Sequence, residues 1–358
     1  MNILKTMYSL LIALLILNAS CTNQPKTDPK IAAYLNEALD TMRTYALNTD
    51  QVNWEQLKKE VIEKAAGAKT TPEVYHLVRY ALRSLKDDHS FLQLSDSLVT
   101  LEKNARKDQN QKQAHNTPKK APSPYGRRMK IEHGMHQVGK TKIARVFVPQ
   151  GSQGNKFAQR LHDLIIEMDG QKPCGWIVDL RGNGGGNMWP MLAGIGHLVG
   201  ENPLAGSVDG EGKRDYYLYK SGKAIYKHKT GKEDDAYSEV KEAVFGGDKS
   251  APLAFLIDRG TASSGESLAT ILKGRKNTRG FGEATYGAST STRGFKLSDG
   301  SNLVIAVSIF QDRQGNKYPD GIKPDVKIPI GDQKEDPAND PVIKAAIQWL
   351  QEQASCQE

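Results

Sequence analysis

The first candidate for chemistry is a serine in the segment Gly-Thr-Ala-Ser-Ser-Gly-Glu at residues 260–266. This segment follows an apolar run at 252–258, typical of a buried strand, and a helix is expected over 267–273. A hydroxyl at a helix N-terminus gains from the positive end of the helix dipole, which favours a nucleophilic Ser263. Ser263 and Glu266 also have the spacing of a helix capping box, and the local sequence by itself favours that structural role.

A second candidate is the glycine-rich turn Asp-Leu-Arg-Gly-Asn-Gly-Gly-Gly at residues 179–186, which follows another apolar run at 175–180. Glycines turn sharply and can direct backbone N–H groups at a ligand. The spacing does not match a dinucleotide fingerprint, and no Lys-Ser/Thr pair follows as in a phosphate-binding loop. The turn fits an oxyanion hole, with a tight turn that binds nothing as the alternative.

A third candidate is His89 in Asp-Asp-His-Ser at residues 87–90, directly after a predicted helix. A neutral imidazole is a suitable general base because its pKa lies near neutral pH. The chain has eight histidines, and any one of them is more often structural or exposed than catalytic. Taken alone, His89 is therefore weak evidence for a catalytic site.

Charge and composition exclude some classes of function. The chain has 358 residues and a formal net charge of +8. Residues 102–130 hold nine Lys or Arg against two acidic residues, so the remainder is close to neutral. A polar charge run of this kind is typical of a solvated loop, and we expect no nucleic-acid partner. The sequence contains no His-Glu-x-x-His or Cys-x-x-Cys motif, and we expect neither a metal nor a cofactor.

The N-terminus has the features of an export signal. Lys5 precedes an apolar run at 10–17, which is short for a membrane span. The following Leu-Asn-Ala-Ser-Cys resembles a bacterial lipoprotein box, in which Cys21 would be lipidated and anchor the protein to the membrane, although Asn18 departs from the preferred apolar residue. An ordinary secretory signal is the alternative, and either signal predicts export. Export would permit a disulfide between the two remaining cysteines, Cys174 and Cys356.

The pattern of apolar residues predicts an α/β (α+β) protein. Helical spacing is clearest at 74–85, and a second helix is announced at residue 53. Strands are expected at 142–148, 175–180, 252–258 and 302–311, with a helix at 155–169. We therefore predict five segments: a signal at 1–21, a helical subdomain at 22–98, a basic disordered linker at 99–130, the core at 131–335, and a C-terminal helix or tail at 336–358.

Five motifs occur in one order that resembles the tail-specific (carboxyl-terminal processing) protease family. Asp-His-Ser, the glycine turn and Thr-Ala-Ser-Ser are followed by Gly-Glu-Ala-Thr-Tyr-Gly at 282–287 and Gly-Ile-Lys-Pro-Asp at 321–325. The resemblance implies a crotonase- or Clp-like core that cleaves polypeptides, with Ser263 as nucleophile. The oxyanion donors would be the N–H of Ser264 and that of a glycine in the triple, with Gly185 as the first choice.

The sequence departs from that family at two points, and these change which residue we expect to be the general base. Most bacterial members carry a lysine directly after the motif at 282–287, where this chain has Ala288, and residues 100–140 leave no room for their PDZ domain. The chain therefore looks closest to the nisin-resistance proteases and the tricorn core, in which a histidine from the N-terminal helical region serves as base. His89 has that position. Candidates to orient it remain open among four residues: Asp88, Ser90, Glu266 and Asp320.

The sequence thus predicts an exported serine endopeptidase that forms an acyl-enzyme with a Ser-His dyad and acts on peptides or unfolded protein tails. The expected location is the bacterial cell envelope. A catalytically inactive peptide-binding protein of the same fold is the alternative, and the missing lysine motivates it.

Overall fold

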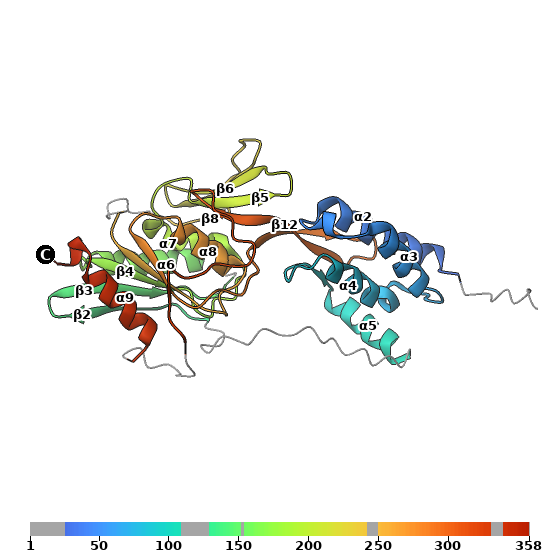
Figure 1. The fold of residues 1–358 in the computed structure, drawn as a ribbon, viewed down its shortest axis with the longest axis horizontal. Helices are drawn as coiled ribbons and strands as arrows, with labels where there is room; N and C mark the ends of the chain where they lie inside the picture. Colours follow the sequence, from blue (N-terminus) through green and yellow to red (C-terminus); the bar gives the residue numbers. More distant parts are fainter. Residues whose placement is uncertain (1–25, 109–128, 152–153, 242–249, 331–338, 358) are drawn as a thin grey trace, which may run out of the picture.

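The computed structural model describes residues 26–108, 129–151, 154–241, 250–330 and 339–357, and Figure 1 shows them as a ribbon. They form two β-sheets, with one group of helices around the first sheet and a second group at the N-terminal end of the chain. In the described part of the chain, no helix combines the length and the apolar character that crossing a membrane requires.

The first sheet is mostly parallel and has the order β13-β10-β9-β4-β3-β2. Its strands are β2 (Glu132–Val138), β3 (Thr141–Phe147), β4 (Gly175–Asp179), β9 (Leu253–Ile257), β10 (Thr278–Gly282) and β13 (Val326–Lys327). Only β2 runs antiparallel to its neighbour. The central strands β4 and β9 are buried along their whole length, as expected for a sheet covered on both faces.

Helices cover both faces of this sheet. Alternate residues of each strand point to opposite faces, so each strand contributes to two cores. The helices are α6 (Gly154–Asp169), α7 (Met188–Ile195), α8 (Ser264–Lys273) and α9 (Pro341–Gln351). Phe255 and Ile257 share a core with α6, α7 and α8. Ala254 and Leu256 pack instead with α9. This arrangement agrees with the α/β core expected from the order of strands and helices.

The second sheet is antiparallel in the order β1-β12-β5-β6-β7-β8, and β11 pairs with the other side of β12. Its strands are β1 (Phe91–Gln93), β5 (Ala205–Asp209), β6 (Arg214–Lys220), β7 (Lys223–Lys227), β8 (Ser238–Glu239), β11 (Thr290–Lys296) and β12 (Asn302–Asp312). The long strand β12 pairs with β1 at one end and with β5 at the other. It therefore connects the two groups of helices (Figure 1).

The N-terminal helices have a hydrophobic core of their own. They are α2 (Pro29–Tyr45), α3 (Trp54–Lys64), α4 (Tyr75–Ser84) and α5 (Asp96–Asp108), with short 3₁₀ turns at Thr49–Gln51 and Thr71–Val74. Leu297, Leu303 and Ile305 from the hairpin of β11 and β12 are buried in the same core. The core of the helical subdomain predicted at 22–98 is thus completed by residues far away in the sequence. Dividing the sequence into consecutive segments cannot detect such a contribution.

Helix α5 occupies ten residues, 99–108, that we predicted as part of the basic linker. Glu102 on this helix pairs with Arg79 of α4 through both carboxylate oxygens, and Glu102 is 8% exposed. Because that ion pair and the packing of Leu98 fix the helix, its high charge does not prevent it from folding. The remaining predicted linker up to residue 128, and the signal at 1–21 with Cys21, lie outside the described residues.

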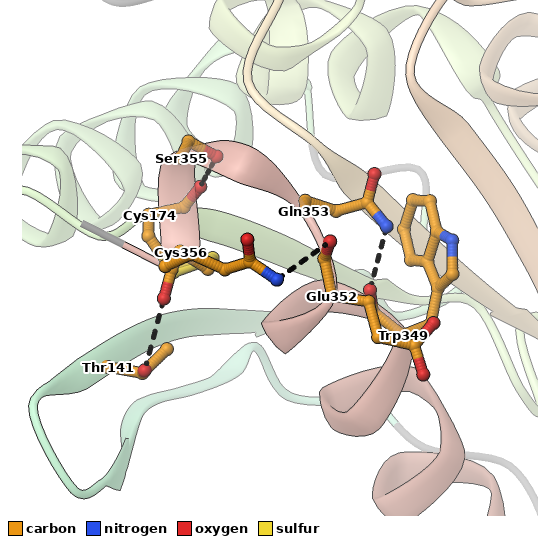
Figure 2. Close-up of a disulfide and its surroundings, with 8 residues drawn as sticks. Thr141, Cys174, Trp349, Glu352, Gln353, Ser355 and Cys356 are labelled. Carbon is orange, nitrogen blue, oxygen red and sulfur yellow. Dashed lines mark hydrogen bonds between the residues drawn. A yellow bond between two sulfur atoms is a disulfide. The ribbon is translucent and has the colours of Figure 1, made fainter.

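A disulfide joins Cys174 and Cys356, whose Cα atoms are 4.9 Å apart (Figure 2). Cys174 directly precedes β4, and Cys356 lies in the 3₁₀ turn Ala354–Cys356 after α9. The hydroxyl of Ser355 donates to the Cys174 carbonyl at 3.0 Å. The C-terminal end of the chain is therefore attached to the start of the central strand, and the pairing that the sequence permitted is present.

Candidate active site

Ser263 stands at the N-terminus of α8, at the carboxyl end of β9. Its backbone has φ +53°, a left-handed conformation that residues other than glycine rarely adopt. Such a conformation costs about 1–3 kcal/mol and persists only where neighbours hold it. The Ser263 N–H donates to Glu266 Oε2 at 2.8 Å, which is the glutamate half of the predicted capping box. The serine is therefore held in a strained turn that a simple helix cap does not require.

The glycine turn lies directly against Ser263. A Cβ atom placed on Gly185 would lie 2.9 Å from Ser263 Cβ and 3.1 Å from Ser264 N. Ala262 N–H donates to the Asn183 carbonyl at 2.9 Å, and the Ser264 hydroxyl donates to the Gly186 carbonyl at 2.6 Å. Folding thus brings the glycine turn into contact with the motif that contains Ser263, and only glycine fits at position 185.

The two predicted oxyanion donors differ in their surroundings. Ser264 is the first residue of α8, where helical N–H groups have no partner within the helix. The N–H of Gly185 donates to the Asn183 side-chain oxygen at 3.0 Å. Asn183 is fully buried and also donates to the Val148 carbonyl at 2.9 Å. In this structure Asn183 therefore holds the glycine turn in shape by engaging the Gly185 N–H.

Glu266 forms a buried junction between α8 and the segment that follows β10. Its side chain is fully buried and accepts from Thr285 Oγ1 at 2.6 Å and from Gly287 N–H at 2.8 Å, besides the Ser263 N–H. Burial raises the pKa of Glu266, against the opposing effect of these hydrogen bonds. The contacts of Glu266 are those of a residue that positions the backbone of Ser263 and of residues 285–287.

His89 lies in the loop between α4 and β1. Its Nδ1 is 2.8 Å from Thr290 Oγ1, at the start of β11. Asp87 holds the loop, because its Oδ1 accepts from the N–H groups of His89 at 2.9 Å and Ser90 at 2.6 Å. Burial lowers the pKa of His89, while the Asp87 charge and a hydrogen bond to the Thr290 backbone oppose that shift. The histidine is therefore oriented and biased towards its neutral form.

Two of the four candidates proposed to orient His89, Ser90 and Glu266, form hydrogen bonds with other groups. The Ser90 hydroxyl donates to Asp87 Oδ2 at 2.8 Å and accepts from the Ala306 N–H at 2.9 Å, which pins the loop to β12. Glu266 has the contacts given above. Asp88 and Asp320 are exposed.

Sequence reasoning missed Asp87 and Thr290, which both form hydrogen bonds with His89 itself. The spacing Asp-x-His-Ser fits a side-chain turn that accepts two backbone N–H groups, and this signal could have identified Asp87. Thr290 stands two residues after Ala288, and no local pattern in the sequence links it to His89.

The segment 285–290 brings the remaining motifs together. Tyr286 N–H donates to the Thr261 carbonyl at 2.9 Å, and Gly287 N–H donates to Glu266. The fifth motif packs on the same segment, because a Cβ atom on Gly321 would lie 2.7 Å from Thr285 Oγ1. Three residues beyond Gly287, Thr290 contacts His89. Each of the five motifs therefore has a contact with this segment or with a residue bonded to it, and the histidine motif has its contact at Thr290.

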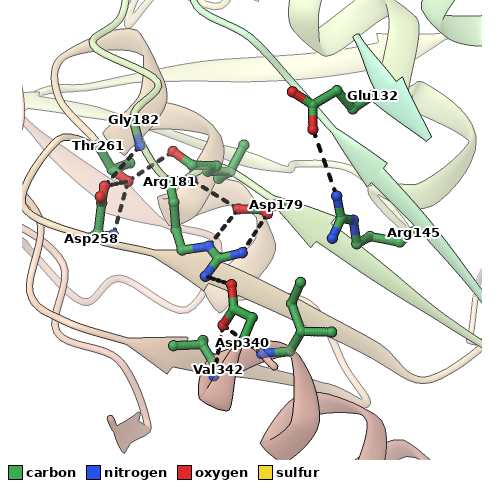
Figure 3. Close-up of polar contacts among 11 residues, drawn as sticks. Glu132, Arg145, Asp179, Arg181, Gly182, Asp258, Thr261, Asp340 and Val342 are labelled. Atoms are coloured by element: carbon green, nitrogen blue, oxygen red, sulfur yellow. Dashed lines mark hydrogen bonds and ion pairs between the residues drawn. The ribbon is translucent and has the colours of Figure 1, made fainter. Parts of the chain in front are cut away.

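A buried ionic network supports the start of the glycine turn (Figure 3). The Arg181 guanidinium donates to both oxygens of Asp179, at 2.9 and 2.8 Å, and to Asp340 at 2.6 Å. Asp258 accepts from the Gly182 N–H at 2.8 Å and from the Gly260 N–H at 3.0 Å. Asp258 thus connects the glycine turn to the turn that carries Ser263.

The arrangement has the parts needed for covalent acyl transfer. A strained serine, backbone N–H groups beside it and an oriented histidine belong to structural elements that contact the same short segment. Among the residues that the structure describes, no group of three or more His, Cys, Asp or Glu side chains could hold a metal ion.

Comparison with known proteins agrees with this geometry. The profile of peptidase family S41 matches residues 142–328. The nisin-resistance protein of Lactococcus lactis subsp. lactis is 26% identical over 328 residues, which cover 91% of this chain and 88% of that protein. The chloroplastic C-terminal processing peptidase of Tetradesmus obliquus is 32% identical over 168 residues, covering 46% of this chain but only 31% of the relative.

A solved structure shows the same fold. A lipoprotein from Streptococcus agalactiae superposes with a TM-score of 0.61 at 23% identity, over 90% of this chain and 97% of that one. The predicted α/β fold class is thereby confirmed. Because the matched residues 142–328 make up more than half of the chain and include Ser263 with its glycine turn, the chain belongs to peptidase family S41 and is a serine peptidase.

Proposed function

We propose that this peptidase is an exported endopeptidase that cleaves peptides or unfolded protein tails through an acyl-enzyme on Ser263. The observation that carries the proposal is the contact between Gly185 and the Ser263 turn, since a Cβ on Gly185 would lie within 3.1 Å of both Ser263 Cβ and Ser264 N. A carbonyl attacked by Ser263 would develop negative charge beside these backbone groups. The Ser264 N–H and a glycine-turn N–H are the donors that we assign to that charge.

His89 is the proposed general base. We assign the Nδ1 proton to the hydrogen bond with Thr290 Oγ1, and in this tautomer the lone pair for proton transfer is on Nε2. His89 would take the Ser263 proton during attack and return it to the leaving amine. Ala288 supports this assignment, because an alanine cannot replace the lysine base that we associate with this position in related proteases. Thr290, two residues farther on, is the residue that contacts His89.

In this proposal, Gly185 acts as an oxyanion donor only when its N–H breaks its hydrogen bond to the Asn183 side-chain oxygen or donates to that oxygen and to the oxyanion at once. In the structure the Gly185 N–H donates to the Asn183 side-chain oxygen at 3.0 Å. A bifurcated bond to an incoming oxyanion would keep Asn183 in place while Ser264 supplies the second donor.

The proposed substrate is a polypeptide segment, often near a carboxyl terminus. The matched relatives include peptidases named for C-terminal processing, and we carry this substrate class over by analogy. The chain covers less than a third of the length of the Tetradesmus relative, so the rest of that enzyme has no counterpart in the alignment.

Export to the cell envelope, with the membrane reached through a lipid on Cys21, is the proposed location. The disulfide between Cys174 and Cys356 supports it, because disulfides persist mainly in oxidising compartments outside the cytosol. The similarity to a streptococcal lipoprotein supports it as well.

Labelling with a fluorophosphonate probe tests the proposed mechanism. The wild-type enzyme should be labelled on Ser263 and should cleave members of a peptide library, whereas Ser263→Ala and His89→Ala should lose both reactions. Thr261→Ser removes a buried methyl group near the site but keeps the hydroxyl, and serves as the folding control. Wild-type protein that binds peptides but is neither labelled nor able to cleave them would favour the inactive binding protein instead.

A further inference from the structure

The helix α9 extends along the central strand β4 and contacts it at both ends. At the start of β4, a Cβ on Gly175 would lie 2.8 Å from Leu350 Cδ2 of α9, and Cys174 forms the disulfide with Cys356. Beyond the other end of β4, Arg181 donates to Asp340 at 2.6 Å. The helix therefore runs antiparallel to the strand, and its two ends are attached to the two ends of the strand.

Helix α9 and the turn that follows it together extend along the strand. From Cys174 to Arg181 an extended chain spans roughly 23 Å, at about 3.3 Å per residue. Helix α9 itself, Pro341–Gln351, spans roughly 16 Å at about 1.5 Å per residue, and residues 352–356, which include a 3₁₀ turn, complete the distance to Cys356. Ile343 and Ala346 are buried between these ends against Ile177 and Leu256. Helix α9 thus packs along the strand between its two attachments, with its N-terminus at the glycine turn.

Asp340 has two roles at the contact with the glycine turn. Its Oδ1 accepts from the N–H groups of Val342 at 2.9 Å and Ile343 at 3.2 Å, which caps α9. Its Oδ2 accepts from Arg181 Nη1. The Arg181 side chain is 1% exposed and that of Asp340 is 8% exposed, so water screens this ion pair little.

Arg181 directly precedes the first glycine of the glycine turn. The turn includes three glycines with positive φ: Gly182 (+72°), Gly185 (+103°) and Gly186 (+108°). Glycine has more backbone freedom than any other residue, so a turn of this composition keeps one shape only if its ends are fixed. Arg181 fixes the first end through Asp179 and Asp340, and Asn183 fixes the middle.

We propose that Asp340 is a positioning residue for catalysis, which acts through Arg181 to hold the glycine turn against Ser263. This inference rests on the proposed function of the turn as part of the oxyanion hole. The charge of Asp340, and not only its ability to cap α9, is then needed for full turnover. Because the turn would act on the transition state, a loosened turn lowers kcat more than it raises KM.

Two substitutions of Asp340 separate positioning from capping. Asp340→Asn keeps a preferred N-cap residue but removes the charge that pairs with Arg181. Asp340→Glu keeps the charge on a longer side chain, although glutamate is not among the preferred caps. The proposal expects Asp340→Asn to lower kcat at least tenfold with KM within twofold, and Asp340→Glu to retain more kcat than Asp340→Asn. A role in capping alone predicts the opposite order.

Val342→Ala is the matched control, because Val342 is buried in the same first turn of α9 but its apolar side chain can form neither a hydrogen bond nor an ion pair with Arg181. It should lower the melting temperature and leave kcat unchanged. The full chain is used, with kcat, KM and the rate of fluorophosphonate labelling measured for each variant. An active wild-type enzyme together with an Asp340→Asn variant whose kcat stays within twofold would overturn the proposal. A wild-type protein without any activity would instead refute the proposed function.

Discussion

Replacing Gly185 by alanine tests the geometry of the site most directly. The new Cβ would lie 2.9 Å from Ser263 Cβ, 3.0 Å from the Ala262 carbonyl oxygen and 3.1 Å from Ser264 N. Ordinary van der Waals contact begins near 3.4 Å, so the two turns have to separate by about 0.5 Å. All three neighbours belong to the backbone or to a Cβ atom, and no flexible side chain can move aside instead.

The expected loss of kcat follows from that displacement of the two turns. A misplacement of reacting groups by about 1 Å can cost about a hundredfold in rate, and loss of one oxyanion donor costs a hundredfold to a thousandfold. A shift of roughly half that size should lower kcat of Gly185→Ala about tenfold to a hundredfold. Alanine at φ +103° also destabilises the fold by about 1–3 kcal/mol.

Gly67→Ala is the matched control for that backbone strain. Gly67 has φ +87°, and a Cβ there would meet nothing within 4 Å. Both variants should melt at lower temperature than the wild type, but only Gly185→Ala should show reduced kcat and slower fluorophosphonate labelling. If Gly185→Ala turned over peptide at a rate within twofold of Gly67→Ala, the contact between the glycine turn and Ser263 would have no catalytic role.

Three further predictions concern the histidine and the disulfide. The base works when neutral, and burial lowers the pKa of His89, so kcat/KM should rise with pH through a midpoint below about 6.5. Asp87→Asn removes a charge that raises this pKa and should move the midpoint to still lower pH; a shift to higher pH would refute the assignment. Thr290→Val removes the hydroxyl bonded to Nδ1 and should lower kcat about tenfold or more, with His89→Ala as reference; an unchanged kcat would mean that Thr290 does not orient the base. The disulfide closes a loop with a sequence separation of 182, so Cys174→Ser with Cys356→Ser should cost about 2–5 kcal/mol in chemical denaturation, and an unchanged midpoint would contradict this.

The core of the fold could be predicted because its signals are local. Largely apolar runs such as 175–180 and 252–258 belong to strands that are buried on both faces, and the structure has β4 and β9 there. The five ordered motifs led to the family for a similar reason, since each is a short contiguous segment. The N-terminal boundary could not be predicted, because Leu303 and Ile305 complete that core from the far end of the chain.

The site was predictable only in part. Ser263 and Gly185 belong to motifs of unusual composition, and the structure places them side by side. The environment of His89 depends on Thr290, which reaches it through the pairing of β11 with β12 and of β12 with β1. Such a contact depends on tertiary structure and leaves no periodicity or spacing in the sequence. The same holds for Asp340, whose bond to Arg181 exists only because α9 lies along β4.

The position of β12 near the end of the chain determines when the site can form as the chain is synthesised and folds. This strand pairs with β1 beside His89 and with β11 at Thr290, and it extends to residue 312. A growing or translocating chain that lacks these residues already carries both His89 and Ser263, but nothing yet holds the two parts of the site together. Pairing between such distant segments is also slow. In the proposed mechanism, His89 and Ser263 can therefore work together only after β12 has paired with β1 and β11.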